Sequence, residues 1–183
     1  MKHTRKTYRL TLSALFAALC CVMTMMVQIP IPTAGYIHFG DVFVLLSGWL
    51  LGFPGVIAAG IGSMFADLFT GYASYAPITF VDKAATALVA WLVYALLKKI
   101  FPRKWAFVGL ILSAILGELV MAAGYIGYEW MLYGFGKAIL NLVPYLIKGG
   151  ISVALACLLY PVTKRIMRRM GIESNYSTFP KAR

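Results

Sequence analysis

Residues 106–128 read AFVGLILSAILGELVMAAGYIGY, an apolar run in which Glu118 is the one charged side chain. About 20 predominantly apolar residues are enough for a helix to cross the ~30 Å hydrocarbon core of a bilayer. The run therefore predicts a transmembrane helix. It also places a carboxylate at membrane depth, where ionisable side chains are rare and usually functional.

The composition of the whole chain agrees with this interpretation. Of its 183 residues, 61% are hydrophobic and 13% are charged, whereas soluble domains are about 45–50% apolar and about 25% charged. Too few polar groups remain to cover a water-exposed surface. Because no low-complexity linker divides the chain, residues 1–183 are expected to form a single membrane domain.

Proline and glycine mark where the other apolar segments end. The Ile-Pro-Ile-Pro run at 29–32 ends the first segment, and Leu-Gly-Phe-Pro-Gly at 51–55 divides a stretch that is too long for one helix. The sequence predicts an all-α bundle of six transmembrane helices, two of which are short for a full bilayer. The expected helices are residues 10–28, 41–51, 55–69, 80–97, 106–128 and 138–162, followed by a basic tail, 163–183.

The orientation follows from the lysines and arginines, because cytoplasmic loops of membrane proteins carry an excess of them. Of the 17 in the chain, 14 lie in three regions: residues 1–9, the loop at 98–104 and the tail. With six spans these regions share one side, so both termini are expected in the cytoplasm. The same distribution explains the net charge of +11 without nucleic-acid binding.

Two ionisable residues fall near the middle of the predicted bilayer. Glu118 lies about 17 Å from the inner end of its helix, and Lys148 lies about 15 Å from the outer end of the last helix. A short loop joins these helices, so the two side chains are able to meet. They form either a structural ion pair or part of a polar cavity that reaches substrate, and intramembrane charges favour the second interpretation.

Other acidic residues gather in the outer half of the predicted bundle. Asp41 opens a helix, where a carboxylate stabilises free N–H groups, and capping accounts for it. Asp82 admits both capping and binding, since it precedes Lys83 and follows an aromatic loop. Asp67 lies near a helix C-terminus, which disfavours an acid, so a ligand, Lys83 or loop donors should stabilise it. Glu129 maps near the same outer face.

Aromatic side chains cluster in two outer segments, around Tyr75 and around Tyr125. They form either the interfacial belt of tryptophan and tyrosine or a stacking surface for a flat heterocycle. The neighbouring acids favour a binding site, to which Asn141 and His38 add neutral hydrogen-bonding groups. The candidate substrate-binding residues are Asp67, Tyr72, Tyr75, Asp82, Lys83, Glu118, Tyr125, Glu129, Asn141 and Lys148.

Small residues recur at three- and four-residue spacing on the first helix, including Ala14 and Ala18. Such rows allow helix backbones to approach closely in lipid, and they serve either internal packing or docking of another membrane protein. The sequence contains no nucleotide-binding, hydrolase or zinc-protease motif. No enzyme activity, metal or cofactor is therefore expected, and uphill transport needs energy from a partner or an ion gradient.

Several short motifs stand out along the chain: Gly40–Trp49, Ala59–Ser63, Ala66–Asp67, Tyr75–Pro77, Thr79–Phe80, Gly117–Glu118 and Gly124–Tyr125. Together they resemble the S components of bacterial energy-coupling factor (ECF) vitamin transporters, in particular the riboflavin-, hydroxymethylpyrimidine- and pyridoxine-type branch. The resemblance extends over residues 10–162. Lys148 matches no part of this pattern, so the resemblance assigns it no role.

The resemblance implies six helices, an outer vitamin site in a multi-pass protein of the bacterial cell membrane, and docking onto a membrane T component that bears two ATP-binding cassette ATPases. In such families an alanine pair on the first helix faces the T component, and Ala14 and Ala18 match that pair. The expected substrate is a small flat heterocycle, either a vitamin B6 form or hydroxymethylpyrimidine, with riboflavin as the alternative. A non-transporting membrane scaffold and an enzyme that uses Glu118 or Asp67 as general base are the competing hypotheses.

Overall fold

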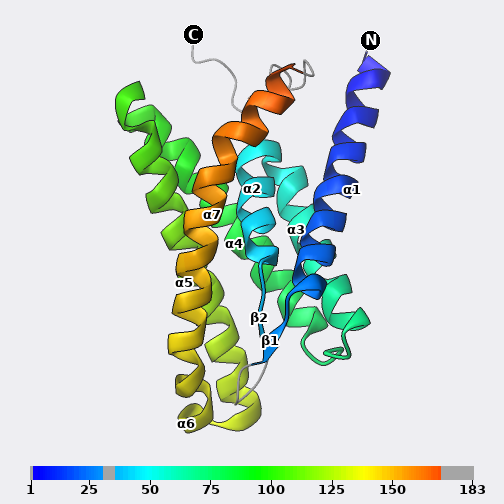
Figure 1. Cartoon of the computed structure of the whole chain (residues 1–183), viewed down its shortest axis with the longest axis vertical. Helices are drawn as coiled ribbons and strands as arrows, with labels where there is room; N and C mark the ends of the chain where they lie inside the picture. The colour runs from blue at the N-terminus through cyan, green and yellow to red at the C-terminus, as the bar shows by residue number, and fades with distance from the viewer. Residues whose placement is uncertain (1, 31–35, 170–183) are drawn as a thin grey trace.

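The computed structural model describes residues 2–30 and 36–169 and confirms the all-α class. Six long helices form a bundle, joined by short strands and turns (Figure 1). The long helices are α1 (Lys2–Met26), α2 (Gly40–Leu51), α3 (Phe53–Phe69), α4 (Ala76–Ile100), α5 (Ala106–Tyr133) and α7 (Leu142–Arg169). The short elements are β1 (Ile29–Pro30), β2 (Tyr36–Ile37), the 3-10 turns η1 (Arg103–Trp105) and η2 (Ile139–Asn141), and α6 (Phe135–Ala138).

Several helices extend further than the sequence predicts. α1 begins at Lys2 rather than residue 10, so the basic arm is helical, and it ends at Met26 rather than residue 28. α4 begins at Ala76 rather than residue 80, because Pro77 falls in the first turn, where a backbone N–H has no helical partner in any case. α5 continues to Tyr133 rather than ending at residue 128.

The last helix differs most from its predicted boundaries. The short α6 and η2 stand where a regular helix was expected to begin at residue 138. α7 then continues past Pro161 to Arg169 instead of ending at residue 162. Residues 170–183 of the predicted tail lie outside the described residues, as do residues 31 and 32 of the first predicted break.

The predicted break between the second and third helices lies at Gly52. This residue has a φ of 65°, a region that residues with a side chain enter only at a steric cost. Its N–H donates to the carbonyl of Gly48, so it still closes the last turn of α2. α3 starts at the next residue, with Pro54 in its first turn, two residues earlier than predicted.

Within residues 2–30 and 36–169, four helical segments are long and apolar enough to cross a bilayer. α2 and α3, with 12 and 17 residues, extend only about 18 Å and 26 Å. The antiparallel pair β1–β2, with Ile29 opposite Ile37, continues from the start of α2 (Figure 1). Irregular backbone at membrane depth is tolerated where protein surrounds it. The segments that are long and apolar enough to cross a bilayer are Thr7–Met26, Ala76–Ile100, Ala106–Tyr133 and Phe135–Arg169.

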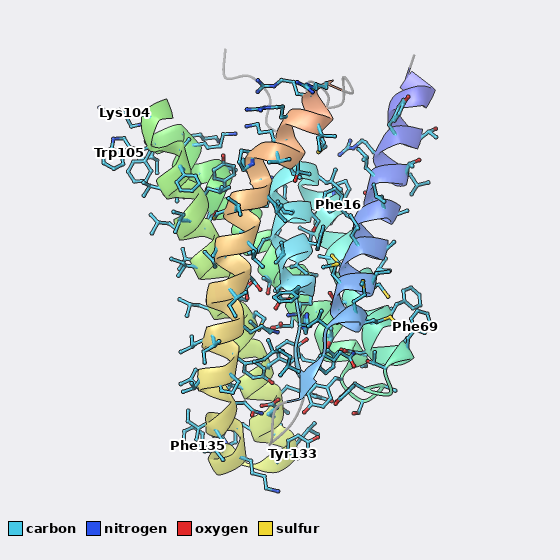
Figure 2. The ribbon with its side chains drawn as sticks, in the orientation of Figure 1. Phe16, Phe69, Lys104, Trp105, Tyr133 and Phe135 are labelled. Carbon is cyan, nitrogen blue, oxygen red and sulfur yellow. The ribbon has the colours of Figure 1, made fainter. Side chains whose placement is uncertain are left out.

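The two ends of the bundle differ in composition. Figure 1 shows the first turns of α1, the α4–α5 connection and the last turns of α7 at one end, and α6 at the other. Lys104 and Trp105 mark the first end in Figure 2, and Tyr133 and Phe135 mark the opposite end. The basic segments that the sequence places in the cytoplasm therefore share one end of the structure.

Close helix packing in this bundle depends on glycine. A methyl group at Gly62 of α3 would overlap the carbonyl oxygen of Ala17 on α1. At Gly48 of α2 the same methyl group would lie 2.5 Å from the carbonyl oxygen of Ala87 on α4. Small residues thus set the separation of α1 from α3 and of α2 from α4. At Ala17 the small-residue row of the first helix takes part in internal packing, which is one of its two predicted roles.

We predict that Gly62→Ala lowers the free energy of unfolding by about 1–3 kcal/mol, because the added methyl group forces α1 away from α3. Thermal unfolding of the purified protein in detergent measures the effect. Gly127→Ala is the matched control, since nothing lies within 4 Å of a methyl group there, and it should leave the midpoint unchanged or slightly raised. Equal loss of stability in both variants would contradict the α1–α3 packing.

Candidate functional site

A buried carboxylate with two lysines occupies the middle of the bundle. Asp41, in the first turn of α2, has no exposed surface. Its Oδ1 lies 2.6 Å from Nζ of Lys83 on α4, and its Oδ2 lies 2.9 Å from Nζ of Lys148 on α7. Three helices that are distant in sequence are therefore joined through one side chain. We call Asp41, Lys83 and Lys148 the charged triad.

The triad changes two expectations from the sequence. Asp41 does lie in the first turn of a helix, but its oxygens face two lysines, so capping alone does not account for it. Lys148 pairs with Asp41, and no ion pair joins it to Glu118 in the part of the chain that the structure describes. α5 and α7 are neighbours as expected, yet Gly149 faces Glu118: a methyl group there would lie 3.2 Å from its Cβ. Successive side chains of a helix are rotated by about 100° around its axis. Because Gly149 faces α5, the preceding Lys148 is directed toward α2 instead.

His38 lies beside the triad in the connection between β2 and α2. Its Nδ1 accepts the backbone N–H of Gly40 at 3.0 Å, and its Nε2 lies 3.4 Å from Nζ of Lys148. Because a backbone N–H only donates, Nδ1 has to be the acceptor, so the ring is neutral and carries its proton on Nε2. Nε2 and Lys148 are thus two donors directed at the same space.

A small cavity of about 30 Å³ adjoins Lys148 and His38. A cavity of this volume has room for water, since one water molecule needs about 10–15 Å³. Its wall combines tyrosine rings from β2, the α3–α4 connection, α5 and α7 with one carboxylate and one ammonium group. We call it the tyrosine cavity. Its lining residues are Tyr36, His38, Asp67, Tyr72, Tyr75, Tyr125, Tyr145 and Lys148.

The tyrosine rings contact one another around this cavity. Tyr125 and Tyr145 stack with ring centroids 5.6 Å apart and planes inclined by 29°. The ring centroid of Tyr72 lies 5.0 Å from that of Tyr36 and 6.3 Å from that of Tyr75. The ammonium of Lys148 lies 5.6 Å from the ring centroid of Tyr125 and 5.7 Å from that of Tyr145, within cation–π distance. The wall thus offers ring faces and a positive charge together.

Asp67 brings the carboxylate of the wall from the C-terminal part of α3. The hydroxyl of Tyr36 donates to its Oδ1 at 3.0 Å. An acid near a helix C-terminus needs a stabilising partner, and for Asp67 this partner is the hydroxyl of Tyr36 in β2. No ion pair joins Asp67 to Lys83 or Lys148 among the described residues, so its carboxylate and the ammonium of Lys148 are separate features of the cavity.

A second polar cluster supports the tyrosine cavity from the α6 end. Glu129 of α5 is fully buried and accepts hydrogen bonds from the hydroxyl of Tyr145 and, at 2.8 Å, from Nδ2 of Asn141. Glu129 and Asn141 are not among the described lining residues of the cavity. They hold Tyr145 in position instead, so their effect on a ligand would pass through that ring.

The structure brings half of the predicted binding residues to the tyrosine cavity and places the others around it. Glu118 lines a separate crevice of about 270 Å³ between α5 and α7, and neither of its carboxylate oxygens has a hydrogen-bond partner in the described chain. Asp82 is buried against Gly124. The predicted residues that line the cavity are Asp67, Tyr72, Tyr75, Tyr125 and Lys148, and those outside it are Asp82, Lys83, Glu118, Glu129 and Asn141.

Sequence reasoning missed Tyr36, Tyr145 and the role of Asp41, and it treated His38 only as a minor contributor. Tyr145 precedes Lys148 by three residues, and such pairs share a helix face, so this signal was available. Tyr36 lies in a strand of two residues, which is too short for any periodicity to reveal. Within residues 2–30 and 36–169, no group of His, Cys, Asp and Glu is arranged to hold a metal ion.

A wide apolar groove of about 530 Å³ lies between α1 and α3. Ala14 and Ala18 line it, and both are exposed. Phe65 and Phe69 of α3 lie in its wall, and Figure 2 shows Phe69 at the edge of the bundle. The small-residue row of α1 thus serves internal packing at Ala17 and leaves an open apolar surface at the two predicted docking residues.

A family model described as the S component of the ECF-type riboflavin transporter matches residues 4–165. The chain belongs to this family. It is therefore the substrate-binding subunit of a vitamin transporter, a multi-pass membrane protein and not an enzyme. The resemblance to ECF S components that the sequence motifs indicate is confirmed.

The chain is also similar to two other proteins. The chain is 38% identical over 122 residues to an uncharacterized protein in gap 3'region of Pyrococcus woesei, covering 64% of this chain and 76% of that protein. A solved structure described as the structure and mechanism of the S component of a bacterial ECF transporter superimposes with a TM-score of 0.63 at 22% identity. The match covers 90% of this chain and 98% of the other, and it shows a shared fold.

We predict that Asp41→Asn lowers the free energy of unfolding by about 3–5 kcal/mol, because two buried ammonium groups lose their carboxylate. Denaturant unfolding in detergent measures the change. The double variant Asp41→Asn/Lys83→Met removes one of the uncompensated charges and should recover part of the loss. An Asp41→Asn protein as stable as the parent would show that the triad is not a buried charge cluster.

Proposed function

We propose that this S component captures a small planar heterocyclic vitamin or precursor in the tyrosine cavity, namely a vitamin B6 form or hydroxymethylpyrimidine. The observation that carries the proposal is the wall of the cavity: five tyrosine rings with the ammonium of Lys148 and the carboxylate of Asp67. Ring faces bind a flat ligand through area and stacking. The two charged groups then fix its orientation through its acceptor and donor edges.

The size of the cavity supports a one-ring ligand. Pockets for small molecules are about 300–1,000 Å³, whereas the tyrosine cavity has about 30 Å³. The tyrosine side chains therefore have to move apart on binding, and a pyridine or pyrimidine requires less displacement than a three-ring flavin. Riboflavin is the second candidate, because the matching family is described as a riboflavin transporter S component.

The proposed transport path follows from topology and composition. All six long helices span the cell membrane, with α2 completed by the β1–β2 pair, and the end that carries the basic segments faces the cytoplasm. The tyrosine cavity then opens toward the outside. Because the sequence has no nucleotide-binding motif, a membrane T component with two ATP-binding cassette ATPases supplies the energy. The T component docks on the α1–α3 groove at Ala14 and Ala18.

Vitamin binding is tested directly by titrating the purified protein in detergent with pyridoxine, hydroxymethylpyrimidine and riboflavin, using calorimetry. We expect submicromolar affinity for one of them, and Tyr72→Ala should weaken it about 3- to 10-fold through loss of one ring contact. Tyr8→Ala is the control, since Tyr8 is an exposed residue of α1 outside the cavity. Absence of micromolar binding for all three vitamins would contradict the proposal.

Docking is tested by copurification with the T component and its ATPases. Ala14→Trp and Ala18→Trp fill the α1–α3 groove, so we expect both to abolish association while vitamin binding persists. Val22→Trp is the control, because Val22 is an exposed apolar residue of α1 that lies outside the groove lining. Association that survives both alanine substitutions would place the docking surface elsewhere.

Orientation is tested with reporter fusions in cells. A green fluorescent protein fused after residue 183 should fluoresce, because that end is cytoplasmic, and alkaline phosphatase at the same place should be inactive. Alkaline phosphatase fused after Gly134, at the end of α5, should be active. The reverse pattern would place the tyrosine cavity on the cytoplasmic side and contradict uptake.

A further inference from the structure

The charged triad contains two ammonium groups for one carboxylate. Asp41 meets both lysines, and side-chain exposure is 1% or less for Lys83 and Asp41 and 2% for Lys148. A buried ion pair is nearly neutral when one charge of each sign is present. With two lysines the triad keeps one positive charge among side chains that are almost fully buried.

The other acidic side chains near the triad do not complete it. Asp82 on α4 and Glu118 on α5 are buried, but neither forms an ion pair with a lysine in the described chain. Asp67 on α3 accepts from Tyr36 in the cavity wall. His38, which lies beside Lys148, is a neutral donor. The excess positive charge is therefore not matched by a direct contact among the described residues.

The two lysines differ in their access to the tyrosine cavity. Lys148 lines it, whereas Lys83 is fully buried and is not among the described lining residues. The ammonium of Lys83 pairs with Asp41, and it lies 5.0 Å from the ring centroid of Tyr125. Lys83 can therefore influence a ligand in the cavity only through Asp41 and Tyr125.

The donors of His38 and Lys148 at the cavity favour a ligand atom that accepts hydrogen bonds. Nε2–H of His38 and the ammonium of Lys148 lie 3.4 Å apart and both line the cavity. Two donors do not satisfy each other, and a ligand oxygen or nitrogen between them would accept from both. A hydrogen bond between ionised groups is about twice as strong as one between neutral groups, and an acidic group of the ligand becomes an ionised acceptor when it loses its proton.

We infer that Lys83 determines the charge selectivity of the site: it neutralises Asp41, and so leaves the positive charge of Lys148 for an anionic or acidic group on the ligand. The inference rests on the proposed function, since it assumes that a heterocycle binds in the tyrosine cavity. Lys83 is a positioning residue that acts through Asp41, and it does not touch the ligand.

The inference narrows the ligand class. The acceptor edge has to carry an ionised or acidic group, such as the phenol of a hydroxypyridine or the imide of a flavin. A neutral aminopyrimidine, such as hydroxymethylpyrimidine, has no such group. Among the three candidate vitamins, pyridoxine and riboflavin therefore match the triad, and pyridoxine also matches the small cavity.

The test compares a ligand with its analogue that lacks the acidic group. Pyridoxine is titrated against 3-deoxypyridoxine, and riboflavin against N3-methylriboflavin, with the full-length protein in detergent. The parent protein should prefer the acidic member of the pair that binds by about 10- to 100-fold, as expected for a buried hydrogen bond to a charged group. Lys83→Met should weaken binding of the acidic member by about that factor and leave the affinity for its analogue unchanged. Lys83→Arg, which keeps the charge, should retain the preference.

The double variant Asp41→Asn/Lys83→Met separates charge from packing. It removes both partners, so Lys148 keeps its positive charge and the preference should return. It also decides the test if Lys83→Met does not elute as a folded protein on size exclusion. Equal weakening of both analogues by Lys83→Met, a double variant without the preference, or a parent protein that does not distinguish the analogues would overturn the inference. A parent protein that binds none of the four compounds would instead contradict the proposed function.

Discussion

The Asp41 carboxylate holds two lysine ammonium groups, 2.6 and 2.9 Å away, inside a helix bundle. Charges at membrane depth are unfavourable unless they are paired, so the position of each lysine is fixed once Asp41 is fixed. The consequence is geometric as well as electrostatic. The first turn of α2, the N-terminal part of α4 and the N-terminal part of α7 therefore have to meet at one point.

The tyrosine cavity depends on the triad. Lys148 reaches the cavity because Asp41 draws it toward α2, and the ring of Tyr125 contacts both lysines. His38 is held by the N–H of Gly40 immediately before Asp41, so the same short segment of α2 fixes two of the donors that line the site. At the α6 end, Glu129 holds Tyr145 against Tyr125. The wall is thus assembled from side chains that are each fixed by a buried partner.

The sequence predicts the helical class, the break at Gly52 and the basic segments at one end, because these depend on local composition and on proline and glycine. Five of the residues that it proposes for binding line the cavity, since ionisable and aromatic side chains recur in the segments that meet there. It does not predict the role of Asp41, because an acid in a first helical turn has a sufficient local explanation. Nor does it distinguish Lys148 from Gly149 as the neighbour of Glu118, since that choice depends on helix rotation, which neighbouring helices fix.

We propose that the tyrosine cavity binds a flat heterocyclic vitamin next to Lys148 of the triad. Native mass spectrometry of the protein purified from vitamin-supplied cells is the sharpest test, because it identifies a copurifying small molecule without prior choice of ligand. We expect one heterocyclic vitamin per chain, absent from a variant in which Tyr72 and Lys148 are both replaced by alanine. A protein that carries no heterocycle, or a double variant that carries it at the same occupancy, would rule out this site.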